Sequence, residues 1–193
     1  MFGQFQMNYT IRRLMLSDAL IFTGIGLVVP ILSIFVKDNL SGGSIAAAGI
    51  ATFIFLATKS MVQIPFSNFT DGNPGIRMKF LIFGTFLMSG AALLFVPATT
   101  VATIYLAQLL RGIGAGLAYP CWQELWTSHL DKHHEGFEWS LYNGAISVGM
   151  ATSALVGGTL AELIGFGWTF SLMSLLIFIA GLSLVQLYHS HHK

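Results

Sequence analysis

Charged residues are scarce in this sequence, and cysteine occurs only once. Only 9% of the 193 residues are charged, whereas a soluble globular domain carries about 25%. The lone Cys121 excludes an internal disulfide and a zinc site built from cysteines. With a net charge of +1, we expect no nucleic-acid partner. The sequence also lacks the motifs His-Glu-x-x-His and Gly-x-Ser-x-Gly, and we predict neither an enzyme nor a bound cofactor.

The abundant feature is apolar sequence in long runs. Hydrophobic residues make up 54% of the chain and the mean hydropathy is +0.73, which predicts an integral membrane protein in contact with the lipid bilayer. Runs long enough to cross a bilayer as helices cover residues 14–36, 44–66, 79–97, 100–124, 139–162 and 166–188. We therefore predict an all-α membrane protein with a single six-helix transmembrane domain over residues 1–193. The first run lacks a small-residue cleavage site and is followed by further spans, so we interpret it as a retained helix.

The few positive charges are unevenly distributed between the connections. If the spans alternate in direction, one side of the membrane receives Arg12, Arg13, Arg77, Lys79, Lys132 and Lys193. Only Lys37 falls on the other side. Because basic residues accumulate on the cytoplasmic side, we predict that both termini are cytoplasmic. The expected location is the inner (plasma) membrane of a bacterium.

Two ionisable residues interrupt the first two apolar runs. Asp18 lies about one turn inside the first, where it is either a capping or interfacial residue or a protonatable group at the mouth of a cavity. Lys59 lies in the second run, where it either extends its ammonium to the headgroups or faces the bundle and pairs with a carboxylate. Pro30 is expected to kink the first helix.

The fourth run has a polar and aromatic stripe along one helical face. Its members recur at steps of three and four residues: Tyr105, Gln108, Arg111, Ala115, Tyr119 and Trp122. An unpaired arginine at mid-span costs about 2.5–3.5 kcal/mol, so Arg111 requires a partner or water. It is either a functional group or part of a structural ion pair. We predict a substrate or ion-coupling site formed by Arg111, Gln108, Tyr119, Trp122, Asp18 and Lys59.

The fifth run carries small residues at steps of four. Gly149, Ser153 and Gly157 share one face, followed by Gly158, and this spacing predicts close packing against a neighbouring helix.

A metal site could be drawn from His133, His134 and Glu138, but adjacent histidines do not share a helical face. We therefore predict no metal site.

Three segments resemble motifs of the major facilitator superfamily. Between the second and third runs, Asp71, Gly75, Arg77 and Lys79 resemble the family's loop signature, with Ser67 and Gly72 departing from it. In the fourth run, Arg111 followed by closely spaced glycines resembles the fourth-helix motif. In the fifth run, Gly149, Gly157 and Gly158 match the antiporter motif, with Ala154 at the position of the proline that marks drug–proton antiporters.

Nearly the whole chain therefore resembles one half of a major facilitator transporter. The resemblance implies two inverted three-helix repeats, here 14–98 and 99–188, and secondary active transport of a small solute by alternating access. It also implies a conformational latch formed by Asp71, Arg77 and Lys79. We expect a parallel homodimer with its twofold axis along the membrane normal, and an anionic or amphipathic substrate. The alternatives are one half of a heterodimeric transporter with a separate partner, and a non-transporting subunit or assembly partner.

Overall fold

The protein is a bundle of α-helices in the computed structural model, which describes residues 8–70 and 74–191. The helices are α1 (Tyr9–Val28), α2 (Leu32–Asn39), α3 (Ile45–Thr70), α4 (Pro74–Leu93), α5 (Val101–His129), α6 (Glu135–Ile164) and α7 (Phe166–His191). Five of them, α3 to α7, are long and apolar enough to cross a membrane, and α1 with α2 makes a sixth, bent span. The predicted all-α membrane bundle is therefore confirmed.

The first predicted span, 14–36, is broken into two helices. The axes of α1 and α2 differ by 42°, and Pro30 lies in the break between them. Proline has no N–H to continue the helical ladder, and the backbone N–H of Ile31 instead bonds the carbonyl of Val28 at 3.1 Å. The expected kink is present, and the span extends beyond the predicted limits at both ends.

α5 and α6 also run past the predicted ends of their spans, whereas α4 ends at Leu93 and not at the predicted residue 97. α5 continues to His129 and α6 already begins at Glu135, so the connection predicted from Thr127 to Glu138 shrinks to residues 130–134. A carboxylate oxygen of Glu138, Oε2, accepts a hydrogen bond of 3.1 Å from the backbone N–H of Asp131. The apolar runs underestimated the lengths of α5 and α6, because hydropathy does not detect polar helix ends.

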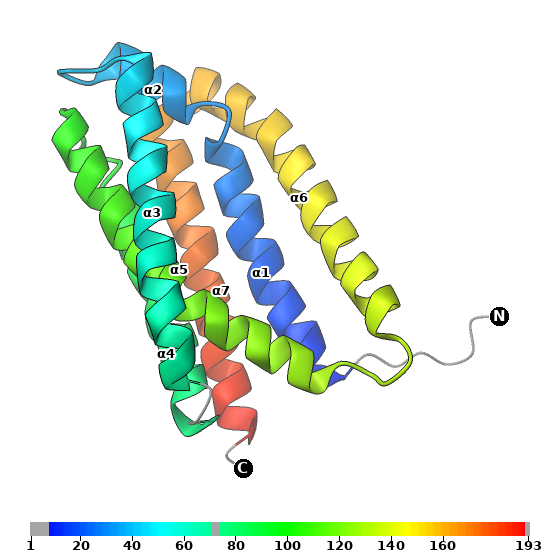
Figure 1. Ribbon diagram of the computed structural model, residues 1–193. Coiled ribbons are helices and arrows are strands. Elements are labelled where there is room, and N and C mark those ends of the chain that lie inside the picture. The colour runs from blue at the N-terminus through cyan, green and yellow to red at the C-terminus, as the bar shows by residue number, and fades with distance from the viewer. Residues whose placement is uncertain (1–7, 71–73, 192–193) are drawn as a thin grey trace.

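The helices form two triplets that meet along one pair. α5 packs on α3 and α4, whereas α1 packs on α6 and α7, and the pair α4 and α7 joins the two groups. Figure 1 shows α5 crossing the bundle diagonally and α6 lining its edge beside α1. The first described residues and the last lie at the same end, where Arg13 Nη1 donates a hydrogen bond of 3.2 Å to Gln186 Oε1. We call this the terminal end.

Close packing of α1 on α6 uses the small residues predicted for that role. A Cβ added at Gly157 would overlap the backbone of Leu27, and one added at Gly26 would overlap Ser153. A Cβ added at Gly149 would lie 3.3 Å from Oγ1 of Thr23, which is closer than an ordinary van der Waals contact. Gly158 differs from the prediction, because nothing lies within 4 Å of a Cβ added there. It follows Gly157 directly and so points about 100° away around the helix.

The outward faces of α3 and α6 are apolar and uncovered. On α3, Ile45 and Met61 are 73% and 75% exposed, and on α6, Leu155 and Leu163 are 78% and 76% exposed. In a membrane-spanning bundle such faces contact lipid tails or another apolar helix. The contact with the lipid bilayer predicted from composition follows from these surfaces.

Candidate ligand cavity and polar network

A cavity of about 210 Å³ lies inside the bundle, among α1, α3, α4 and α5. Its walls are formed by Asp18, Ile21, Phe22, Ile25, Phe55, Lys59, Leu81, Thr85, Met88, Ala115, Ala118, Tyr119 and Trp122. Ala115 and Ala118 contribute only methyl groups from α5, which leaves space opposite the larger side chains of α1. The walls are predominantly apolar, and the ionisable acid and base among them are Asp18 and Lys59.

Asp18 is held by a partner from the other side of α1. The side chain is 8% exposed, and its Oδ2 accepts a hydrogen bond of 2.7 Å from the phenol of Tyr142 on α6. Tyr142 is itself buried and was not among the predicted site residues. The two residues are 124 positions apart, so no local pattern in the sequence could have paired them.

Lys59 faces the cavity rather than the headgroups. Its Nζ lies 4.1 Å from the centroid of the Tyr119 ring, which is a cation–π contact. The ion pairs of the described residues join Lys37 to Asp38 and Arg77 to Glu124, and neither involves Lys59. The structure thus favours the inward-facing alternative for Lys59, with an aromatic ring in place of a carboxylate as its partner.

Aromatic side chains form a layer at the terminal side of the cavity. Trp122 lines the cavity, and its ring centroid lies 5.1 Å from that of Trp126 and 5.0 Å from that of Tyr142. The Trp139 centroid lies 5.6 Å from that of Trp126. The indole nitrogens of Trp122 and Trp126 are buried and have no hydrogen-bond partner among the described residues. Trp122 is the member of this layer that lines the cavity.

Arg111 and Gln108 lie outside the cavity, which differs from the prediction. Arg111 is 6% exposed and Gln108 is 2% exposed, and the guanidinium donates a hydrogen bond of 2.8 Å to Gln108 Oε1. The guanidinium carbon lies 5.0 Å from the ring centroid of Phe55 and 5.7 Å from that of Phe95. Phe55 also lines the cavity, so Arg111 contacts a residue of the cavity wall without being a lining residue itself.

The predicted substrate site is therefore divided between two places. Asp18, Lys59, Tyr119 and Trp122 meet around the cavity. Gln108 and Arg111 instead form a buried pair two to three turns closer to the opposite end of α5. Gln108, Arg111, Tyr119 and Trp122 share one stripe of α5, as the helical spacing predicts. The spacing could not say where an aromatic side chain from α3 would contact that stripe.

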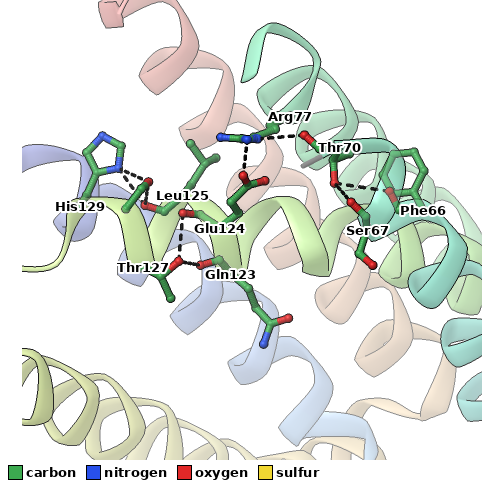
Figure 2. A network of polar contacts seen from close by, with 10 residues as sticks. Phe66, Ser67, Thr70, Arg77, Gln123, Glu124, Leu125, Thr127 and His129 are labelled. Carbon is green, nitrogen blue, oxygen red and sulfur yellow. Dashed lines mark hydrogen bonds and ion pairs between the residues drawn. The ribbon is translucent and has the colours of Figure 1, made fainter. Parts of the chain in front are cut away.

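A polar network joins three helices at the terminal end (Figure 2). Arg77, at the start of α4, forms an ion pair with Glu124 on α5. Its Nε also donates a hydrogen bond of 3.2 Å to the carbonyl of Thr70, the last residue of α3. The Thr70 hydroxyl in turn donates to the carbonyl of Ser67 at 3.0 Å. Arg77 thus connects the ends of α3, α4 and α5.

Of the other two predicted latch residues, the structure describes only Lys79, which makes no contact in this network. Lys79 is exposed, and Asp71 lies outside the residues that the structure describes. Glu124 was not predicted as the partner of Arg77, because the sequence places 46 residues between them.

These features define an integral membrane protein that is a six-span helical bundle with an acid and a base facing one internal cavity. The chain belongs to the Major Facilitator Superfamily, whose sequence model matches residues 14–192.

Individual relatives agree with this assignment. The chain is similar to the "Quinolone resistance protein NorA" of Staphylococcus aureus, with 27% identity over 156 residues, which cover 81% of this chain and 39% of that protein. It is also similar to the "MFS-type transporter SLC18B1" of Rattus norvegicus, with 26% identity over 179 residues that cover 84% of this chain and 38% of that protein. The chain spans about two fifths of the length of these relatives.

Proposed function

We propose that this chain is one six-helix half of a secondary active transporter that moves a small solute across a membrane by alternating access. The observation that carries the proposal is the cavity, which exposes Asp18 and Lys59 inside a bundle of the Major Facilitator Superfamily. Charged side chains within the hydrocarbon region are costly, and they mark substrate and ion pathways in membrane proteins. The names of the two relatives, one a resistance protein and one a transporter, are in line with this role.

The helix contacts support a division into two three-helix repeats, 14–98 and 99–188. α3 packs on α5 as α6 packs on α1, and α4 packs on α5 as α7 packs on α1. Exchanging the first repeat with the second therefore reproduces the same set of contacts. Such a relation is what inverted repeats within a half-transporter produce.

A second six-helix bundle would complete the transporter. We propose a second copy of this chain, related by a twofold axis along the membrane normal, with both termini in the cytoplasm of a bacterium and the bundle in its inner membrane. The uncovered apolar faces of α3 and α6 offer surfaces for this contact. The two bundles would rock against each other around a midplane site. A different chain that supplies the second bundle is the alternative arrangement.

The latch of this cycle would lie at the terminal end. The bond of Arg77 to Glu124 ties α4 to α5 within one bundle, which leaves Lys79 and Asp71 as groups for contacts between bundles. Asp71→Asn should then change the labelling of cysteines placed on one face of the membrane, because the balance between inward and outward states shifts. Unchanged labelling would argue against a latch.

Reconstitution tests the proposal directly. The purified chain is first weighed by native mass spectrometry from a mild detergent, where a homodimer has about twice the 20.9 kDa of one chain. Proteoliposomes that contain it are then assayed for uptake of labelled amphipathic solutes, with Asp18→Asn and Lys59→Gln as variants. The matched control is Lys37→Gln, since Lys37 is exposed at the opposite end from the termini. Flux that is lost in both cavity variants supports transport, and absence of flux from a stable dimer supports the non-transporting subunit.

A further inference from the structure

We propose that the cavity binds a small zwitterion with a single-ring apolar body, whose ammonium group lies at Asp18 and whose carboxylate lies at Lys59. The proposal rests on the proposed function in that it names the solute class of the same site. It follows from how the two charges are held, from the shape of the walls, and from the location of the cavity within one bundle.

Two opposite charges face the same apolar space without touching. Asp18 and Lys59 both line the cavity, yet no carboxylate oxygen of Asp18 lies within ion-pair distance of Lys59 Nζ. A charge in an apolar cavity is stable only when it is paired or hydrogen-bonded. A ligand with one charge would place an opposite charge next to only one of these groups, whereas a zwitterion would place an opposite charge next to both.

Two tyrosines keep the charges apart and leave bonding capacity for a ligand. Tyr142 donates from α6 to one carboxylate oxygen of Asp18, Oδ2, and Oδ1 has no hydrogen bond to the described residues. Tyr119 holds the ammonium of Lys59 over its ring, which uses none of the three N–H donors. A ligand ammonium can therefore donate to Oδ1, and a ligand carboxylate can accept from Nζ.

The apolar walls of the cavity suit a flat apolar group. Phe22, Phe55 and Trp122 bring aromatic surfaces from α1, α3 and α5, and Met88 adds a flexible side chain from α4. The volume of about 210 Å³ exceeds that of an engineered cavity of about 150 Å³ that binds benzene. One ring with a short charged chain is the size class that this space accommodates.

The lining residues all come from this chain. Because the lining residues that the structure shows lie on α1, α3, α4 and α5, binding can be measured on the purified protein by itself. Binding and transport are then separate readouts. Specific binding without flux would contradict the transporter proposal alone, and flux of other solutes without this charge preference would contradict the zwitterion proposal alone.

The experiment uses three probes that share a phenyl ring and a two-carbon chain. L-Phenylalanine is the zwitterion, 2-phenylethylamine is the cation and 3-phenylpropionate is the anion. Calorimetric titration at pH 7.5 into the full chain in nanodiscs should show phenylalanine binding about tenfold more tightly than either singly charged probe. This factor is a modest part of the attraction between opposite charges about 4 Å apart in a partly buried site.

Two variants assign each end of the ligand. Asp18→Asn should remove the advantage of phenylalanine over 3-phenylpropionate, and Lys59→Gln should remove its advantage over 2-phenylethylamine. Lys37→Gln should leave all three affinities unchanged. Size-exclusion profiles identify a variant that has lost its fold, in which case Asp18→Glu and Lys59→Arg, which keep the charges, should retain the order of the three probes.

Three outcomes would overturn the proposal. The first is equal affinity for the three probes, or no binding of any of them. The second is a preference for the cation that Lys59→Gln does not alter, which would leave Asp18 as the sole charged contact. The third is a preference for the anion that survives Asp18→Asn, which would assign the recognition to Lys59 alone.

Discussion

The phenol of Tyr142 donates a 2.7 Å hydrogen bond to Oδ2 of Asp18 and thereby links α6 to α1 at the edge of the cavity. The carboxylate is oriented by a helix that contributes no wall of its own to that space. Tyr142 also packs against Trp122 and Trp126, so the aromatic layer and the carboxylate depend on each other. The position of the Asp18 carboxylate is thus maintained by Tyr142, a residue that does not line the cavity.

Removing the hydroxyl group of Tyr142 should weaken the link between α1 and α6 without opening a cavity in the aromatic layer. Tyr142→Phe is expected to lower the stability of the bundle by about 1 kcal/mol, because hydrogen bonds between membrane helices contribute about that much. Thermal unfolding in one detergent, followed by tryptophan fluorescence, measures the change. Tyr105→Phe is the matched control, since the phenol of Tyr105 makes no hydrogen bond to the described residues. Equal shifts for the two variants would contradict the structural role of Tyr142.

Neighbouring glycines on α6 should respond very differently to the same substitution. Gly157→Ala introduces a methyl group that overlaps the backbone of Leu27, whereas Gly158→Ala introduces it where nothing lies within 4 Å. We expect Gly157→Ala to destabilise the bundle by about 1–3 kcal/mol, as overpacking does. Gly158→Ala should be neutral or slightly stabilising, because alanine is the better helix former. Unfolding temperatures of the two variants, compared in the same detergent, test the packing of α1 on α6.

The ion pair of Arg77 and Glu124 should be stronger than an exposed one. The two side chains are 16% and 26% exposed, whereas Lys37 and Asp38 are 56% and 54% exposed at 3.8 Å. Breaking a shielded pair leaves one charge poorly solvated, and exposed pairs contribute only about 0–1 kcal/mol.

A double-mutant cycle measures this difference. Arg77→Met and Glu124→Met should each destabilise the protein, and the double variant should be less destabilised than the sum, with a coupling energy above about 1 kcal/mol. The same cycle on Lys37 and Asp38 should give a coupling near zero. Similar coupling energies for the two pairs would show that the Arg77 pair is not shielded.

Replacing Arg111 should abolish transport and leave ligand binding nearly unchanged. Arg111→Leu is expected to abolish flux through reconstituted protein while the oligomeric mass stays unchanged, because an arginine retained in the hydrocarbon region marks a functional role. Affinity for phenylalanine should change by less than about twofold, because the guanidinium lies against the ring of Phe55 and Arg111 does not line the cavity. Normal uptake by Arg111→Leu would exclude the transport role. A large loss of binding would show that the guanidinium reaches the ligand.

Much of the fold was predictable from local sequence. Each apolar run coincides with a helix or with the bent pair α1 and α2, and Pro30 lies at the bend, as its missing N–H requires. Helix ends were less predictable, since α5 and α6 extend into polar sequence around His129 and Glu135. Part of the candidate site also followed from the sequence: Asp18, Lys59, Tyr119 and Trp122 meet at the cavity.

The sequence by itself determined that this chain lies in a membrane as an all-α bundle of the Major Facilitator Superfamily. Hydropathy and motif spacing are local properties, and a bilayer requires every span to satisfy its own backbone hydrogen bonds. Only the tertiary structure decided that Tyr142 holds Asp18, that Arg77 pairs with Glu124, and that Arg111 lies against Phe55 and does not line the cavity. These contacts depend on how each helix is rotated about its own axis and on how it is tilted relative to its neighbours. Long-range packing, such as that of Gly157 on Leu27, sets both.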